Sequence, residues 1–339
     1  MKKNGFTLIE LLAVLTLLAF VALITVPVME SILESSKKKT KDASIKEIIS
    51  ATKKYVTKYP EKINFDTDNE FLLPVNILKS SEFLNDENYI DPETKKPFSG
   101  SIYIKYNPTK YTYTYYYFYK AIETNDVTNC FMFSNGTITG YNNDTPACVK
   151  QDIEIPTTIN GIKVRKIENP TSSAKQYLVN ARKVDFSKAL YLDEILNNAF
   201  NKTTGTTVNM DYLDLSNNSL LQSIGDSAFG NTGYLNIYKL SLPDNIETIG
   251  YKTFRDNNIA QVTLPNKLER IGEEAFAYNK IERIEIPTNV RILSNNCFSN
   301  NLLKSVIINS KKDTTEFSLY RTPFSNNENF TDSKIIWKQ

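Results

Sequence analysis

Ile249-Gly-Tyr-Lys-Thr-Phe254 and Ile271-Gly-Glu-Glu-Ala-Phe276 are two copies of the stretch that decides the fold. One pattern recurs between residues 195 and 298. It consists of an aliphatic residue, a small residue four positions later, and a phenylalanine five positions later. Upstream of each copy lies an L-x-x-L-x-L element, and in the later copies both elements repeat every 22 residues. Because two independent features share one period, the sequence predicts stacked repeats, none of which can bury its apolar face alone.

The repeats resemble the BspA-type leucine-rich repeat, in which a proline follows the strand and the Ile-Gly-x-x-Ala-Phe element comes next. Leu242-Pro243, Leu264-Pro265 and Ile286-Pro287 match this pattern. The resemblance covers residues 151–339 and implies a solenoid. BspA-type repeats often occur in surface adhesins, so the resemblance also implies a binding function.

Polar residues alternate with apolar ones in each predicted strand of the repeats, so the polar side chains should share one surface. The surface mixes positive and negative charges, and its scattered carboxylates do not form an arrangement typical of catalysis. We therefore predict protein or glycan recognition there, with a structural spacer as the alternative. The candidate ligand-binding residues are Lys183, Asp185, Tyr212, Asp214, Lys239, Gln261, Arg283 and Glu285.

The amino-terminal thirty residues differ from the rest of the chain. After the basic leader, residues 6–29 are apolar except for Glu10 and three threonines. As a helix, these residues would extend roughly 36 Å, which is enough to cross a bilayer. A carboxylate inside such a segment is costly unless it is paired, so its presence indicates a function for Glu10.

Lys2-Lys3-Asn4-Gly5-Phe6-Thr7-Leu8-Ile9-Glu10 resembles the class III signal of type IV pilins and pseudopilins. The resemblance implies cleavage between Gly5 and Phe6 by a prepilin peptidase, N-methylation of Phe6, and a cytoplasmic amino terminus before assembly. The new ammonium group of Phe6 can then pair with Glu10 of a neighbouring subunit, so that two buried charges compensate each other. Pro27 removes one helical hydrogen bond, and pilins often carry a proline there.

One long helix is expected over residues 6–59, because residues 28–59 contain no proline or glycine and carry an apolar stripe at helical spacing. Its first part, residues 6–29, would lie in the membrane or in the core of a fibre. Hairpins are expected at residues 102–118 and 131–139. The predicted fold class is α+β, with four parts: a leader at 1–5, the long pilin helix at 6–59, a small antiparallel β head at 60–150, and the leucine-rich repeat solenoid at 151–339.

The three cysteines of the chain are expected to differ in state. Cys130 and Cys148 bracket the second hairpin, and disulfides persist outside the cell. Because pilins often close a carboxyl-proximal loop this way, the resemblance implies a bridge, which would stabilise by about 3 kcal/mol in the chain-entropy model. Cys297 stands at the small position of its repeat, so we expect it to be buried and unreactive.

Several function classes are excluded by composition. The chain has no histidine, so it cannot build a Ser-His-Asp or Cys-His nucleophile or a histidine-ligated zinc site. A net charge of +2 gives no reason to expect nucleic-acid binding. We therefore expect a protein that is not an enzyme and uses no cofactor or metal.

Together these features predict a minor type IV pilin-like subunit, since a large extra domain on every subunit would crowd a fibre. It would be a single-pass membrane protein before assembly and part of a pilus or the cell surface afterwards. Its expected partners are other pilin subunits, the prepilin peptidase, the membrane, and a protein or glycan ligand. Two alternatives stay open: a pseudopilin of a type II secretion or DNA-uptake piston, and a membrane-tethered surface receptor that does not polymerise.

Overall fold

The structure, a computed structural model, describes residues 36, 39–87, 89–92, 94–118, 130–142, 148, 152–170, 183–201, 208–230, 235–310, 318–319 and 322–338. The chain divides into two compact units, Met1–Ala121 and Ile122–Gln339. The processing and assembly residues Gly5, Phe6, Glu10 and Pro27 lie outside the described residues. In the part of the chain that is described, no helix is long and apolar enough to cross a membrane.

The predicted α+β fold class, with a long pilin helix over residues 6–59, is wrong, because the described chain is mostly β. Its described α-helices are short and cover residues 39–58 and α2 (Val75–Ser80). The earlier part of the predicted helix lies outside the described residues. The prediction counted the long helix as equal to the repeats in setting the fold class. Because each repeat adds two short strands, strand pairing dominates the fold instead.

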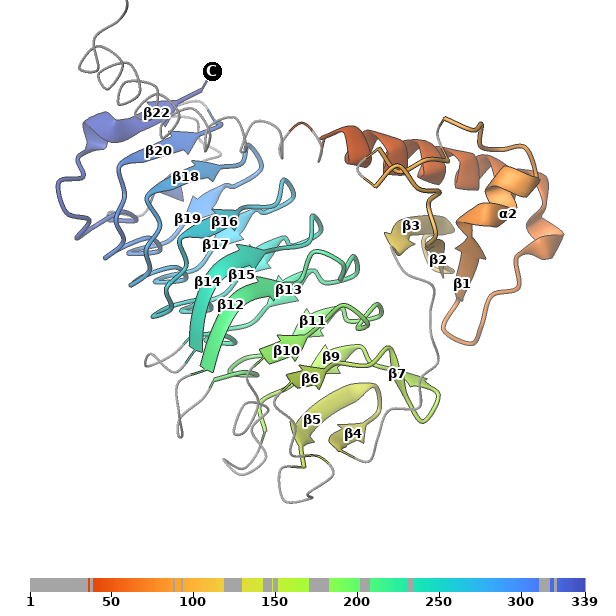
Figure 1. Cartoon of the computed structure of the whole chain (residues 1–339), viewed down its shortest axis with the longest axis horizontal. Helices are drawn as coiled ribbons and strands as arrows, with labels where there is room; N and C mark the ends of the chain where they lie inside the picture. The colour runs from red at the N-terminus through yellow and green to blue at the C-terminus, as the bar shows by residue number, and fades with distance from the viewer. Residues whose placement is uncertain are drawn as a thin grey trace, which may run out of the picture. The chain divides into compact units, whose positions relative to one another are not determined.

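The first unit packs the helix of residues 39–58 against a three-stranded antiparallel sheet of order β1-β2-β3 (Figure 1). The strands are β1 (Glu70–Pro74), β2 (Ser101–Asn107) and β3 (Thr112–Phe118), and the 3-10 turn η1 (Pro60–Lys62) follows the helix. Ile48 and Tyr55 of the helix are buried in one core with Ile102 of β2.

The tyrosine-rich strand β3 is buried only in its second half. The ring of Tyr117 packs edge-on against Phe98 with centroids 5.6 Å apart, and burial raises the pKa of its phenol. Tyr113 is 43% exposed, and Tyr111, just before the strand, is 80% exposed. The carboxyl-terminal end of the tyrosine run is therefore the part that packs in the core.

The second unit is a solenoid whose successive turns are joined by parallel strand pairing (Figure 1). One sheet has nine strands in the order β21-β19-β17-β15-β13-β11-β9-β5-β4. Its bounds are β4 (Phe131–Ser134), β5 (Thr137–Tyr141), β9 (Lys166–Ile167), β11 (Glu194–Ile195), β13 (Ser223–Ile224), β15 (Thr248–Ile249), β17 (Arg270–Ile271), β19 (Ile292–Leu293) and β21 (Ser318–Leu319).

The longer strands of the repeats form three smaller parallel sheets, β6-β10, β12-β14-β16 and β18-β20-β22. Their bounds are β6 (Asp152–Glu154), β10 (Lys183–Asp185), β12 (Val208–Asp214), β14 (Leu235–Ser241), β16 (Gln261–Thr263), β18 (Arg283–Ile286), β20 (Ser305–Ile308) and β22 (Ile335–Trp337). An antiparallel pair, β7 (Thr158–Ile159) and β8 (Ile162–Lys163), lies near the start, and the 3-10 turn η4 (Asp332–Lys334) precedes β22.

The β4–β5 hairpin begins the repeat sheet. β5 pairs in parallel with β9, with Ile138 opposite Ile167. The sequence analysis placed this hairpin in a β head ending at residue 150, whereas the structure groups it with the second unit. A solenoid needs a closing element at its end, and the buried Ile138 supplies an apolar face for that purpose.

A stack of phenylalanine rings runs through the core of the repeats. Neighbouring rings are 4.9 to 6.0 Å apart between centroids and tilted by no more than 21°. Each ring ends the Ile-Gly-x-x-Ala-Phe element of one repeat or a variant of it, so each ring inside the row packs between those of two neighbours. The stacked residues are Phe200, Phe229, Phe254, Phe276, Phe298 and Phe324.

A ladder of buried asparagines, which the sequence analysis did not identify, runs beside the rings. The Asn279 amide nitrogen donates to the carbonyls of Phe254 and Phe276, each at 3.0 Å. Its amide oxygen accepts the N–H of Ile259 at 3.0 Å. Each asparagine thus satisfies backbone groups of two consecutive repeats that the core shields from water. The equivalent residues, three positions after the stacked phenylalanine, are Asn257, Asn301 and Asn327.

The glycine of the repeated element is required by close contact between turns. A Cβ on Gly272 would lie 2.5 Å from the backbone carbonyl of Gly250 in the preceding repeat. At position 272 no larger residue fits without separating the two turns, whereas Leu196 and Ser294 occupy the equivalent position in two other repeats.

We predict that Asn279→Ala lowers the free energy of unfolding by about 2–4 kcal/mol, because buried backbone groups lose their partner. Guanidinium denaturation followed by circular dichroism measures the effect. Asn266, exposed on the same part of the solenoid, provides the matched control, and Asn266→Ala should change stability by less than about 0.5 kcal/mol. Equal effects of the two substitutions would contradict the role of the ladder.

We also predict a stepwise count of reactive thiols. Cys130 and Cys148 form a disulfide with 5.4 Å between their Cα atoms, and burial raises the pKa of the Cys297 thiol. Iodoacetamide should therefore label no cysteine in the folded chain, one after unfolding, and all three after unfolding with a reductant. Mass spectrometry reads the count, and three labels without reductant would contradict the bridge.

Candidate functional site

The eight candidate ligand-binding residues lie on the strands of the three smaller sheets. In the described strands, β10 is not paired with β12, and β16 is not paired with β18. The candidates therefore fall on three hydrogen-bonded groups of strands, although β10 still contacts β12 and β16 still contacts β18.

Two of the candidates are aspartates that end their strands. The Asp185 carboxylate accepts the N–H of Ser187 at 2.8 Å. The Asp214 carboxylate accepts both the N–H of Ser216, at 3.0 Å, and its hydroxyl, at 2.6 Å. Such turns stop a strand by capping the next backbone donors, so part of the hydrogen-bonding capacity of Asp185 and Asp214 serves the fold. Lys183, at the start of β10, is exposed.

The central group lies on β12, β14 and β16. Lys239 Nζ lies 5.1 Å from the centre of the Tyr212 ring, and the Tyr212 hydroxyl is 2.9 Å from Ser241 Oγ. Gln261 is the register partner of Lys239 on the next strand and is exposed. This group therefore combines an exposed aromatic ring with a cation and hydroxyl groups.

Tyr238 joins the central group although the sequence analysis omitted it. It is 50% exposed, similar to Tyr212 at 47%. The L-x-x-L part of the repeat leaves two consecutive residues, Tyr238 and Lys239, between the buried Ile237 and Leu240. Treating both Tyr238 and Lys239 as outward-facing would have identified Tyr238 from the sequence.

The third group is tied to the last strands of the chain. Glu285 Oε1 accepts the Asn309 amide nitrogen at 2.8 Å and pairs with Lys338 Nζ at 2.9 Å. Arg283 is exposed and lies in register with Ser305. The Glu285 carboxylate thus links three neighbouring segments, which is a structural role.

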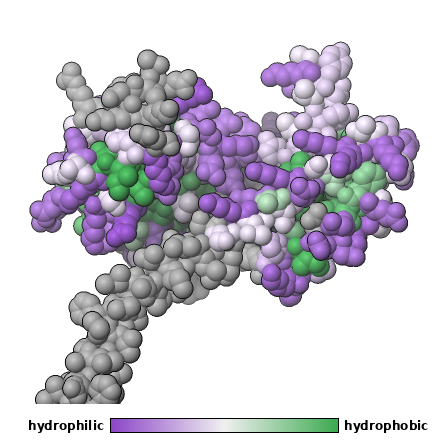
Figure 2. Space-filling model, turned by 90° about the horizontal axis from the view of Figure 1, so that it is seen from above, coloured by the Kyte–Doolittle hydropathy of each residue, from purple (hydrophilic) through white to green (hydrophobic). Residues whose placement is uncertain are grey.

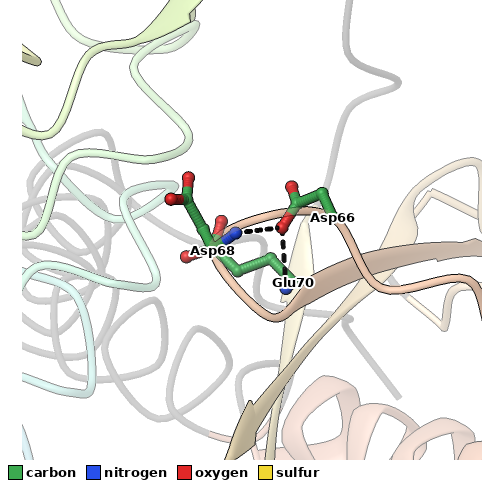
Figure 3. Close-up of side chains that lie close together, drawn as sticks. All are labelled: Asp66, Asp68 and Glu70. Carbon is green, nitrogen blue, oxygen red and sulfur yellow. Dashed lines mark hydrogen bonds between the residues drawn. The ribbon is translucent and has the colours of Figure 1, made fainter.

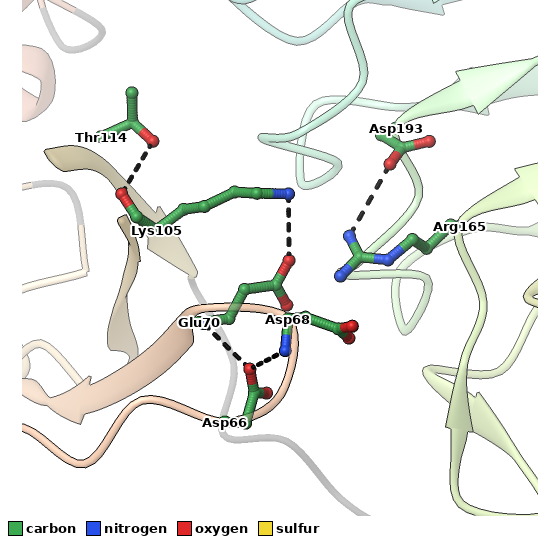
Figure 4. Close-up of polar contacts among 7 residues, drawn as sticks. All are labelled: Asp66, Asp68, Glu70, Lys105, Thr114, Arg165 and Asp193. Atoms are coloured by element: carbon green, nitrogen blue, oxygen red, sulfur yellow. Dashed lines mark hydrogen bonds and ion pairs between the residues drawn. The ribbon is translucent and has the colours of Figure 1, made fainter. Parts of the chain in front are cut away.

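Three carboxylates of the first unit, Asp66, Asp68 and Glu70, lie close together (Figure 3). Their oxygens are within 4.8 Å of one another, but local structure accounts for the grouping. Asp66 Oδ1 accepts the backbone N–H groups of Asp68, at 3.0 Å, and Glu70, at 2.9 Å. The Glu70 side chain is only 2% exposed and pairs with Lys105 Nζ at 3.3 Å (Figure 4). The cluster is therefore a turn followed by an ion pair in which Glu70 is buried and Lys105 is half exposed.

Ion pairs also join adjacent turns of the solenoid. Arg165 pairs with Asp193 at 3.7 Å (Figure 4), and Lys304 pairs with Glu282 at 2.8 Å. Both pairs are partly exposed, so each contributes about 1 kcal/mol or less. They hold surface side chains in place more than they stabilise the fold.

Comparison with known families identifies two segments of the chain. A model of the prokaryotic N-terminal methylation motif matches residues 1–26. A model of the BspA type leucine-rich repeat region matches residues 193–331, with six copies. No curated protein matches the chain. The chain therefore joins a prokaryotic N-terminal methylation motif to a BspA-type leucine-rich repeat region.

Proposed function

We propose that this chain is a non-enzymatic, pilin-like surface subunit that displays its repeat region to bind a protein or glycan. The observation that carries the proposal is the combination of an N-terminal methylation motif with a solenoid on the same chain. The first directs the chain to a pilus or the cell surface, and the second offers a long, rigid surface for recognition.

The amino-terminal segment serves processing and assembly in this proposal. The prepilin peptidase cuts between Gly5 and Phe6, and Phe6 is then methylated. Glu10, four residues further on, pairs with the new ammonium group of a neighbouring subunit. A subunit in the wrong register leaves both charges unpaired in apolar surroundings, which costs several kcal/mol. The pair therefore sets the register of assembly.

The central group of the strand face is the preferred contact region for the ligand. Tyr212 and Tyr238 are about half exposed, and Tyr212 is held by Lys239 and Ser241. An ordered aromatic side chain loses little conformational entropy when a ligand packs on it. Arg283 and Lys183 would add charge at the neighbouring groups.

We predict that Glu10→Ala leaves cleavage after Gly5 intact but abolishes assembly, because the ammonium group of Phe6 loses its partner. Mass spectrometry of the amino terminus reports cleavage, and recovery of the chain in sheared fibres reports assembly. Glu34→Ala, outside the apolar segment, is the matched control and should assemble as the wild type does. Normal fibres from the Glu10→Ala chain would show that register does not depend on this pair.

The proposal as a whole is tested by immunogold microscopy of sheared fibres with an antibody to residues 151–339. We expect sparse labelling of fibres, because about 190 extra residues on every subunit would crowd a fibre. Dense labelling along the whole fibre would contradict a minor role. Labelling confined to the cell body, with a leader that is uncut in wild-type cells and no effect of losing the prepilin peptidase, would favour a tethered receptor instead.

A further inference from the structure

Two exposed tyrosines lie at the ends of one side-chain network that crosses from one repeat to the next. Tyr251 is 41% exposed and Tyr278 is 46% exposed. Lys252 Nζ lies 4.5 Å from the centre of the Tyr251 ring, and the Arg255 guanidinium carbon lies 4.7 Å from the centre of the Tyr278 ring. Each ring thus carries a cation on one of its faces.

Glu274 joins the two cations. Its Oε2 atom pairs with Lys252 Nζ at 3.6 Å and also with the Arg255 guanidinium group. Oε2 makes both ion pairs, and the other carboxylate oxygen, Oε1, has no hydrogen-bond partner among the described residues. The side chains of Glu274, Lys252 and Arg255 are 22%, 30% and 28% exposed, respectively. A carboxylate acceptor is therefore held in place with one oxygen available to a ligand.

The backbone fixes the positions of these side chains. The N–H of Lys252 donates to the carbonyl of Glu273 in the next repeat at 3.0 Å. Lys252 and Glu274 both adopt the left-handed conformation, with φ of 54° and 55°. A hydrogen bond with Tyr251 raises the pKa of the Lys252 ammonium group and ties this cation to the ring beside it. The network is therefore organised before any ligand arrives, which lowers the entropy cost of binding.

We propose that Tyr251, Lys252, Arg255, Glu274 and Tyr278 form an oligosaccharide-binding site on the turns of the solenoid, separate from the strand face. A pyranose ring presents apolar C–H groups on its faces, which pack against aromatic rings, and hydroxyl groups around its rim. Glu274 Oε1 accepts a hydrogen bond from a hydroxyl, while the Lys252 ammonium and the Arg255 guanidinium donate to hydroxyl oxygens. The tyrosines supply the two stacking surfaces.

The same side chains fit other classes of partner less well. The core of a protein-binding surface is enriched in tyrosine and arginine but depleted of lysine and glutamate, whereas Lys252 and Glu274 both stand between these two rings. Glu273 and Glu274 oppose a nucleic-acid phosphate backbone, which requires uncompensated cations. The face seen in Figure 2 is mostly hydrophilic, with apolar residues in separate patches. A ligand rich in hydroxyl groups matches this mixture of rings and charges.

The proposal rests on the proposed function, in which the repeat region is displayed for binding, and adds to it a second site with one ligand class. The test uses the full chain in detergent on an array of immobilised neutral, uronic-acid and sialic-acid oligosaccharides. We expect binding by the wild type and about a tenfold weaker apparent affinity for Tyr278→Ala, because one stacking surface is lost. Tyr278→Phe should bind as the wild type does, since it keeps the ring.

Tyr111→Ala is the matched control, because it removes an exposed tyrosine of the first unit that has no role in either proposed site. It should bind the array as the wild type does, and all variants should keep the thermal unfolding midpoint of the wild type. Tyr238→Ala, on the strand face, reports separately whether the array is bound there. The proposal is overturned if no oligosaccharide binds, if Tyr278→Ala binds normally, or if only Tyr238→Ala weakens binding. The last result would place oligosaccharide binding on the strand face, which agrees with the proposed function but not with the second site. Fibre labelling tests the proposed function independently of the array.

Discussion

Each repeat of this protein is held in place by its contacts with the next repeat. The ring of Phe276 packs between those of Phe254 and Phe298, with centroids 5.4 and 5.2 Å away. Asn279 and Asn301, from two successive turns, both donate to the backbone carbonyl of Phe276. A single repeat offers neither the second ring nor the second carbonyl, so the apolar and polar parts of the core form only when repeats stack. The apolar inward faces of the repeats, the closing hairpin and the glycines at the contacts between turns all follow from this requirement.

The period of the sequence was sufficient to predict the stacking but not its hydrogen bonds. Phenylalanine and aliphatic positions recur because apolar burial needs the same residue at the same place in every turn. Asn279 and its equivalents recur in the same way, but asparagine is also common in turns, so the sequence analysis assigned them no role. Similarly, Cys297 was expected to be buried because it replaces an alanine, and it is fully buried in the structure.

Features that depend on contacts between distant segments were harder to predict. The β4–β5 hairpin was identified from its local alternation, but its pairing with β9 depends on which apolar edge of the solenoid needs covering. The breaks after β10 and β16 reflect local strand geometry that a repeated pattern does not encode. The fold class was wrong because one long helix was given the same weight as the repeats, which supply most of the described strands. Of the eight candidate residues, Asp185, Asp214 and Glu285 have local partners that only the structure reveals.

The division between constrained and variable positions explains where recognition can reside. Stacking fixes the inward residues, whereas the turn positions vary between repeats. The left-handed position of the turn is occupied by asparagine at Asn198 and Asn296 and by serine at Ser227, but by Lys252 and Glu274 in the two repeats between the exposed tyrosines. Asparagine adopts this conformation more readily than a long charged residue does. The chain thus accepts a local cost of about 1 kcal/mol at each site in order to place a cation and a carboxylate where they join Tyr251 to Tyr278.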